Sequence, residues 1–92
     1  PTSSQIVWTE YSRHRAELRE LNLRVLEEIL RYGTERYRDL ETGRSVVVGR
    51  HGRQLVMIPY EYADDMIVPM TVHTTTRQQI RFRLLSGRFT IE

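Results

Sequence analysis

The segment from His73 to Arg77 combines side chains that could handle a phosphodiester. The His73 imidazole titrates near neutrality, so it could act as an acid or a base. Three threonines and Arg77 follow, where a strand pattern changes into a helix pattern, and helix N-termini attract phosphate. Arg81 lies one turn further along the same helix face. We expect His73, Thr75, Arg77 and Arg81 to converge as an anion site; the alternative is a capped helix start beside a surface histidine.

A second basic segment is the predicted turn Arg50-His51-Gly52-Arg53. It places two guanidinium groups and one imidazole within four residues, which suits a phosphate contact. Most such turns are only the solvated tips of hairpins, and we keep that alternative open. If Arg53 points along the sheet toward Arg77, the two basic segments form a single site.

The other titratable and aromatic residues favour structural roles. His14 stands between two arginines in a predicted helix, where a solvated or packed role is more common than catalysis. Tyr60 and Tyr62 share one face of a predicted strand and could stack on RNA bases, although such residues more often belong to a core or an interface. The histidines lack the spacing of a zinc site and there is no cysteine, so we expect neither a metal nor a cofactor.

The positive charge is carried entirely by arginine and is unevenly distributed. All 14 basic residues are Arg, whose planar fork suits phosphate oxygens. Residues 1–48 contain eight Arg and eight Asp or Glu, whereas residues 66–91 contain four Arg and no acid. This distribution predicts that one face of the protein binds anions.

Length and patterning predict a single α+β domain over residues 1–92. No apolar run approaches the about 18 residues that a membrane span requires, and the N-terminus lacks a signal-peptide pattern, so we expect a cytoplasmic protein without membrane contact. Two N-terminal helices, a small antiparallel β-sheet of about four strands and a C-terminal helix are predicted. The helices cover residues 11–21, 23–32 and 77–86, and the strands cover residues 35–40, 45–48, 54–62 and 66–73, with 88–91 as a possible further strand.

Five segments, taken in order, carry a resemblance to a known family. They are Ile6–Glu10, Leu26–Leu30, Arg44–Gly49, Gly52–Leu55 and Met70–Thr76. These segments are similar to an opening strand, a second helix, a hairpin of the form Arg-x-x-x-x-Gly and Gly-Arg-x-Leu, and the start of a last helix. In this order they resemble the RelE/ParE superfamily of toxins from bacterial type II toxin–antitoxin systems, and BrnT-like toxins within it.

The resemblance implies a metal-independent endoribonuclease that cleaves mRNA and is kept inactive by a cognate antitoxin. Such cleavage needs a base for the ribose 2′-hydroxyl, an acid for the leaving 5′-oxygen and cations for the phosphate. The expected partners are therefore RNA and an antitoxin, in a homodimer or a toxin–antitoxin hetero-oligomer. We assign catalysis to His73, Arg77, Arg53 and His51, and RNA binding to Arg44, Arg50, Thr75 and Arg81.

Four residues depart from the family pattern at positions expected to carry activity. His73 stands in place of Arg, Gln79 often in place of Glu, and Arg83 near a Tyr, while Asn22 replaces a Gly at the corner between the first two helices, where we expect it to adopt a left-handed backbone. These departures favour a second hypothesis, a catalytically inactive RNA- or protein-binding module with a RelE-like fold. A third hypothesis is a structural subunit whose arginines only confer solubility.

Overall fold

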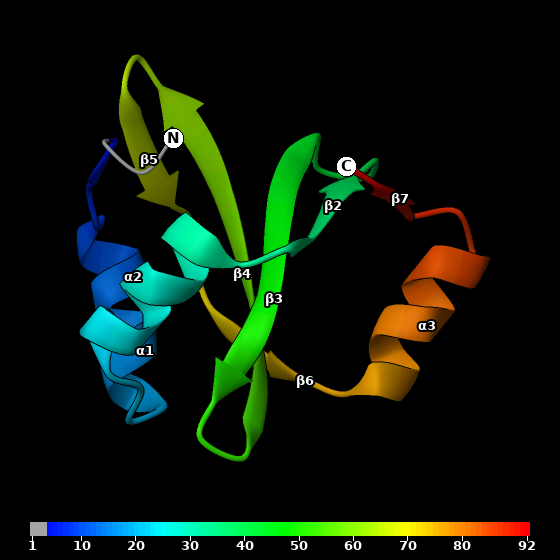
Figure 1. Ribbon diagram of the computed structural model, residues 1–92, viewed down its shortest axis with the longest axis horizontal. Coiled ribbons are helices and arrows are strands. Elements are labelled where there is room, and N and C mark those ends of the chain that lie inside the picture. The colour runs from blue at the N-terminus through cyan, green and yellow to red at the C-terminus, as the bar shows by residue number, and fades with distance from the viewer. Residues whose placement is uncertain (1–3) are drawn as a thin grey trace.

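The computed structural model describes residues 4–92, and these form three helices and seven strands (Figure 1). The α+β class is confirmed. None of the helices in this part of the chain is long and apolar enough to span a bilayer. The helices are α1 (Glu10–Leu18), α2 (Leu23–Tyr32) and α3 (Arg77–Leu85); the strands are β1 (Gln5–Ile6), β2 (Glu35–Asp39), β3 (Arg44–His51), β4 (Gln54–Ala63), β5 (Met66–Pro69), β6 (His73–Thr75) and β7 (Phe89–Ile91).

The strands form one mixed sheet with the order β1-β5-β4-β3-β2-β7, and β6 pairs with β4 beside β5. All pairs are antiparallel except β1 with β5, which is parallel. The four expected strands do pair antiparallel, but the sheet is larger than expected and one added pair, β1 with β5, is parallel. β7 corresponds to the possible strand at residues 88–91. The strands β1, β6 and β7 contain only two or three residues, too few to display an alternating pattern in the sequence.

The strand expected over residues 66–73 is divided in the structure. Pro69 ends β5, and the backbone N–H of Met70 donates to the carbonyl of Pro59 at 2.8 Å. Pro59, opposite Met70, has no N–H to donate back to the Met70 carbonyl, which explains why pairing stops here. The chain resumes as β6 on another part of β4, opposite residues 55–57, and this shift brings His73 to the start of α3.

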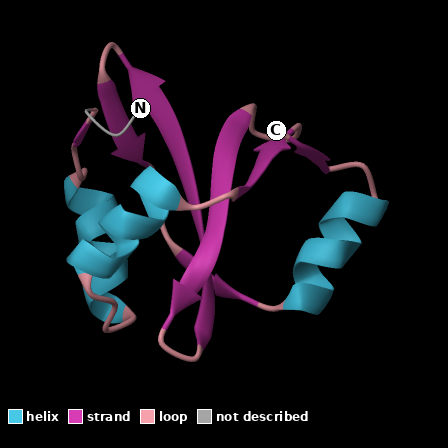
Figure 2. Ribbon diagram, viewed as in Figure 1, coloured by secondary structure: helices cyan, strands magenta, loops and turns pink. Residues whose placement is uncertain are grey.

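Alternate residues of the central strands belong to two cores. Figure 2 shows α1 and α2 on one side of these strands and α3 on the other. One core lies under α1 and α2, and the other lies under α3. Strand alternation places Leu55 and Met57 on one face of the predicted strand and Val56 and Ile58 on the other. The structure confirms this for β4, because Val56 and Ile58 belong to the first core and Leu55 and Met57 to the second. Both faces of β3 and β4 are thus covered, which explains their nearly continuous apolar sequences.

The helix ends follow the expected capping chemistry with one correction. In the sequence, Thr9 or Ser12 could cap the first helix and Thr75 or Thr76 the last helix; in the structure the hydroxyls of Thr9 and Thr76 cap α1 and α3. Asn22 does not adopt the left-handed backbone expected of a corner residue. Its side-chain oxygen instead caps α2, accepting from the Arg24 N–H at 2.8 Å, while Glu20 takes the left-handed conformation with a φ of 56°.

Candidate functional site

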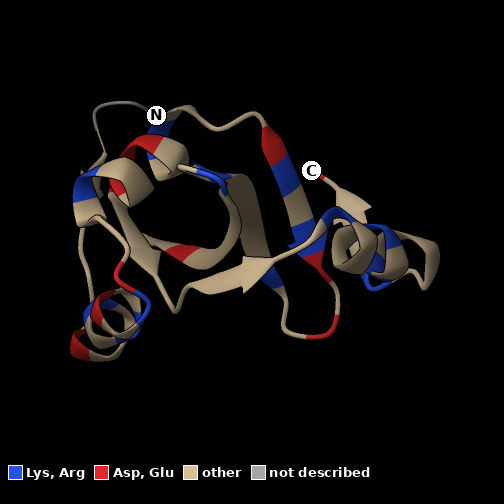
Figure 3. Cartoon of the chain, turned by 90° about the horizontal axis from the view of Figure 1, so that it is seen from below, with Lys and Arg blue, Asp and Glu red and all other residues tan. Residues whose placement is uncertain are grey.

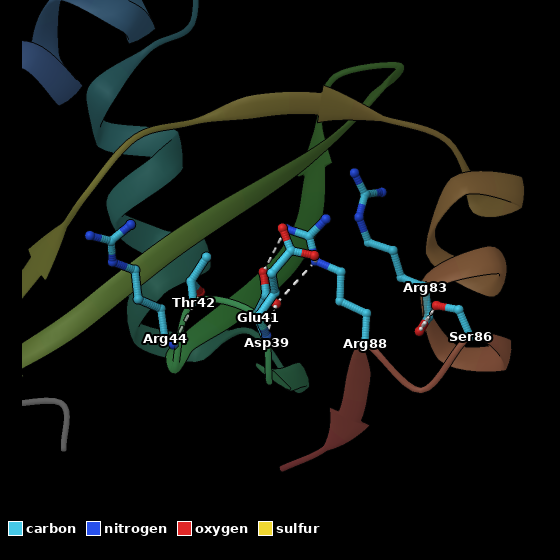
Figure 4. A network of polar contacts seen from close by, with 7 residues as sticks. All are labelled: Asp39, Glu41, Thr42, Arg44, Arg83, Ser86 and Arg88. Atoms are coloured by element: carbon cyan, nitrogen blue, oxygen red, sulfur yellow. Dashed lines mark hydrogen bonds and ion pairs between the residues drawn. The ribbon is translucent and has the colours of Figure 1, made fainter.

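A cleft of about 340 Å³ lies between α3 and the face of the sheet that α3 covers. We call it the α3 cleft. Val46, Met57 and Phe89 give it an apolar floor, and Figure 4 shows several of its polar side chains from close by. Its polar lining comes from segments far apart in the sequence, and includes Arg44, Thr71, His73, Gln79, Arg83 and Arg88.

His73 is the titratable imidazole of this cleft. It pairs directly with Met57, and residues that face each other across an antiparallel ladder project to the same side of the sheet. Because Met57 belongs to the core beneath α3, the imidazole lies on the α3 side. Burial lowers the pKa of His73 below 6.5, and the positive charges of Arg15, Arg19 and Arg83 lower that pKa further. The imidazole is therefore neutral at pH 7 and can accept a proton.

Arg83 is the available cation of the α3 cleft. Its guanidinium carbon lies 5.7 Å from the ring centroid of Phe89 and forms no ion pair with any of residues 4–92. In Figure 4 the Arg83 side chain extends from α3 beside Arg88. An unpaired guanidinium in a partly apolar cleft is well suited to bind an incoming phosphate oxygen.

Arg88, by contrast, is held by Asp39. Its Nε and Nη2 donate to the two carboxylate oxygens at 3.1 and 3.0 Å, and Asp39 is only 5% exposed (Figure 4). Burial alone would raise the pKa of Asp39, but hydrogen bonds from Arg88 and from the Glu41 backbone hold this pKa below its usual value. Asp39 therefore stays ionised, and its charge is balanced within the protein.

Polar groups without charge complete the α3 cleft. The hydroxyl of Thr71 is buried and makes no hydrogen bond within the described part of the chain. Buried hydroxyls normally have a partner, so the hydrogen bond that this group can donate is unused among the described residues. Nearby, the hydroxyl of Thr75 donates to Oε1 of Gln79 at 3.0 Å.

A second hollow adjoins the α3 cleft beyond Thr74 and Thr75, which line both. We call it the arginine hollow, because Arg50, Arg53 and Arg77 line it. The Arg77 guanidinium donates to Glu35 at 2.6 Å and is thus neutralised. Burial alone would raise the pKa of Glu35, but hydrogen bonds from Arg77 and Tyr37 outweigh burial and lower this pKa. Arg50 and Arg53 form no ion pair with any of residues 4–92.

The structure brings together only part of the set of residues predicted from sequence. Arg44, His73 and Thr75 line the α3 cleft, while Arg50, Arg53, Thr75 and Arg77 line the arginine hollow. The expected convergence of His73 with Arg77 is not found, because Arg77 turns to Glu35. Arg81 is exposed and lines neither depression.

His51 lies on the opposite side of the sheet from His73. Its Nε2 accepts a hydrogen bond from the backbone N–H of Asn22 at 2.9 Å, so this nitrogen braces the corner between α1 and α2. The predicted turn begins later than expected, since β3 continues to His51. Tyr60 is buried in the core and unavailable for stacking on bases, whereas Tyr62 and His14 are exposed.

Sequence reasoning did not identify Asp39, Thr42, Thr71 and Arg88 of the α3 cleft, and it named Arg83 only as a departure from the family pattern. One signal was readable, because Gln79 and Arg83 are four residues apart in a helix and so share a face. The pairing of Asp39 with Arg88 spans 49 residues, and nothing local in the sequence indicates it.

What the α3 cleft can do follows from its side chains. Residues 4–92 contain no group of three or more His, Asp or Glu placed to hold a metal ion. No family model, curated protein or solved structure matches this chain. A neutral imidazole can accept a proton, an unpaired guanidinium can bind a phosphate oxygen, and a buried hydroxyl can donate to a second oxygen.

Proposed function

We propose that this protein is the toxin of a bacterial type II toxin–antitoxin pair and that it cleaves RNA without a metal ion. One observation carries the proposal: the neutral imidazole of His73 and the unpaired guanidinium of Arg83 line the same cleft. RNA, unlike DNA, presents a 2′-hydroxyl next to each phosphodiester, so a base and a cation side by side fit its cleavage. The resemblance to BrnT-like toxins of the RelE/ParE superfamily supports the same reaction.

In the proposed reaction, His73 accepts the proton of the ribose 2′-hydroxyl. The 2′-oxygen forms a bond to phosphorus as the bond from phosphorus to the 5′-oxygen breaks, and water protonates the departing oxygen. The products are a 2′,3′-cyclic phosphate and a 5′-hydroxyl. Arg83 and the Thr71 hydroxyl stabilise the negative charge that grows on the non-bridging oxygens.

The proposal includes a cognate antitoxin that covers the α3 side of a cytoplasmic toxin. Two features of α3 support this partner. Figure 3 shows basic segments on this helix, which has no acidic residue, and Phe82 and Leu85 are 71% and 81% exposed. A protein segment with acidic and apolar side chains would complement both the charge and the apolar surface.

The test is cleavage of an end-labelled single-stranded RNA by the purified protein in the presence of a chelator. We expect cleavage by the unaltered protein and a loss of at least about 100-fold for His73→Ala and for Arg83→Gln, because each removes a group that acts in the transition state. Arg13→Gln, on the exposed side of α1, is the control and should cleave normally. DNA of the same sequence should remain intact. Undiminished cleavage by folded His73→Ala would contradict the proposal.

A second candidate function is a module that binds RNA without cleaving it. It is favoured by the lack, among the described residues of the α3 cleft, of a second group that titrates near neutrality and could protonate the 5′-oxygen. The same assay separates the two functions, because salt-dependent RNA binding without products would support the binding module.

A further inference from the structure

We propose that single-stranded RNA runs along β6 and places successive phosphates in the α3 cleft and in the arginine hollow. This inference rests on the proposed function and adds the path of the substrate. It also gives Arg50 and Arg53 a role in binding a neighbouring phosphate, in place of the catalytic role expected for Arg53.

The register of the sheet sets the spacing of the two subsites. Arg50 pairs with Leu55, and Leu55 pairs with Thr75, so these three residues form one row across the sheet. The next row on the same face ends at His73, which pairs with Met57. The two rows are two residues apart along the strands, about 7 Å. This separation is of the order of one nucleotide step along a single strand.

The two depressions adjoin one another along β6. Thr74 and Thr75 line both, so β6 forms their common boundary. Within the described chain, β6 pairs only with β4, which leaves its other edge without a neighbouring strand. An extended nucleic acid can therefore pass along β6 from one depression to the other.

The charges along this path suit a polyanion. Arg83 at one end and Arg50 and Arg53 at the other form no ion pairs with residues 4–92. Among residues 4–92 no acidic side chain lines the arginine hollow, and Asp39 in the α3 cleft is neutralised by Arg88. An acidic peptide would satisfy the same charges, but the row spacing and the imidazole beside Arg83 favour a ribose–phosphate chain.

Binding of a non-cleavable RNA tests the path directly. A fluorescent hexanucleotide with 2′-O-methyl groups is titrated into the unaltered protein and into the double variant Arg50→Gln/Arg53→Gln. We expect the double variant to bind at least about tenfold more weakly, and its slope of log K against log salt to be smaller by about 0.7, since the two arginines contact one phosphate and each single-strand phosphate contact contributes about 0.7. The matched control is Arg13→Gln/Arg24→Gln, which removes two exposed arginines from α1 and α2 and should bind normally.

Substrate length supplies the second readout. A dinucleotide has one phosphodiester, which occupies the α3 cleft alone, so its chemical-shift titration should be the same in the double variant and in the unaltered protein. On a cleavable hexanucleotide, the double variant should raise KM and leave kcat unchanged.

The outcomes separate this inference from the proposed function. If the double variant binds the hexanucleotide as tightly as the unaltered protein does, the path is wrong, whether or not the protein cleaves RNA. If the length dependence appears without cleavage, the path stands and the nuclease proposal fails. Binding of a poly-glutamate peptide but of no oligonucleotide would overturn both.

Discussion

The protonation state of His73 is set by the groups around its imidazole. Partial burial disfavours the charged form, and the guanidinium groups of Arg15, Arg19 and Arg83 act in the same direction. The residue is thereby kept as a base at neutral pH, the state that deprotonation of a hydroxyl requires. A carboxylate beside the imidazole would have had the opposite effect on its pKa, but the acid of this cleft, Asp39, is engaged by Arg88.

The lowered pKa of His73 predicts how stability depends on pH. The unfolded chain binds a proton at this residue below about pH 6.5, whereas the folded protein binds it only at lower pH. The unfolded state therefore holds more protons between these two values, and the free energy of unfolding should fall as the pH drops through this window, by up to about 1.4 kcal/mol per pH unit. Urea denaturation from pH 7.5 to 5 measures this dependence.

The control for this pH dependence is a variant that lacks a histidine outside the α3 cleft. His73→Gln should flatten the decrease in the free energy of unfolding, while His14→Gln, on the exposed side of α1, should retain the decrease attributable to His73. An unchanged pH dependence in His73→Gln would mean that the cleft does not disfavour the protonated imidazole.

At the scale of elements, the close approach of α2 to β3 depends on Gly49. A Cβ atom at this position would lie 2.8 Å from Cγ2 and 2.9 Å from Cγ1 of Ile29, a buried residue of α2. A branched side chain packed in a core cannot move away without disturbing its neighbours. The contact is one way in which the helix pair is held on the face of the sheet opposite the α3 cleft.

Gly49→Ala should accordingly destabilise the protein by about 1–3 kcal/mol, because it overpacks the contact between α2 and β3. The measurement is the free energy of unfolding in urea, made also in an Ile29→Ala background. There the new methyl group enters vacated space, so the cost of Gly49→Ala should be smaller. An equal cost in both backgrounds would show that the contact with Ile29 is not the cause.

The sequence predicts the long elements better than the short ones. The alternation in β4 is long enough to indicate its two faces, and Gly33 and Gly87 correctly mark the ends of α2 and α3. The pairing of β1 with β5 and of β7 with β2 depends on contacts between distant short segments, and no local pattern encodes it. The sequence shows the proline at which β5 ends, but it does not show the register in which β6 then pairs with β4.

At the scale of the whole molecule, a sheet covered on both faces separates residues that are adjacent in the sequence. Arg50 and His51 are neighbours in β3, yet strand alternation sends Arg50 toward the arginine hollow and His51 toward α2. Because Arg50 and His51 are adjacent in the sequence, we expected one basic site at this turn. Neighbouring residues of a strand point to opposite faces, so the two side chains lie on different sides of the sheet. The candidate site could thus be predicted at His73 and Thr75, whereas the role of Arg83 required the packing of α3 on the sheet.

The sharpest test of the account is to map where a nucleotide binds on the entire surface. Backbone amide and imidazole chemical shifts of the labelled protein are followed while a non-cleavable 2′-O-methyl dinucleotide is added. We expect the shifts to gather on β6 and α3, the His73 imidazole to be among the most perturbed groups, and Arg83→Gln to abolish the effect. Shifts that gather instead on α1, α2 and His51, with His73 unmoved, would contradict it.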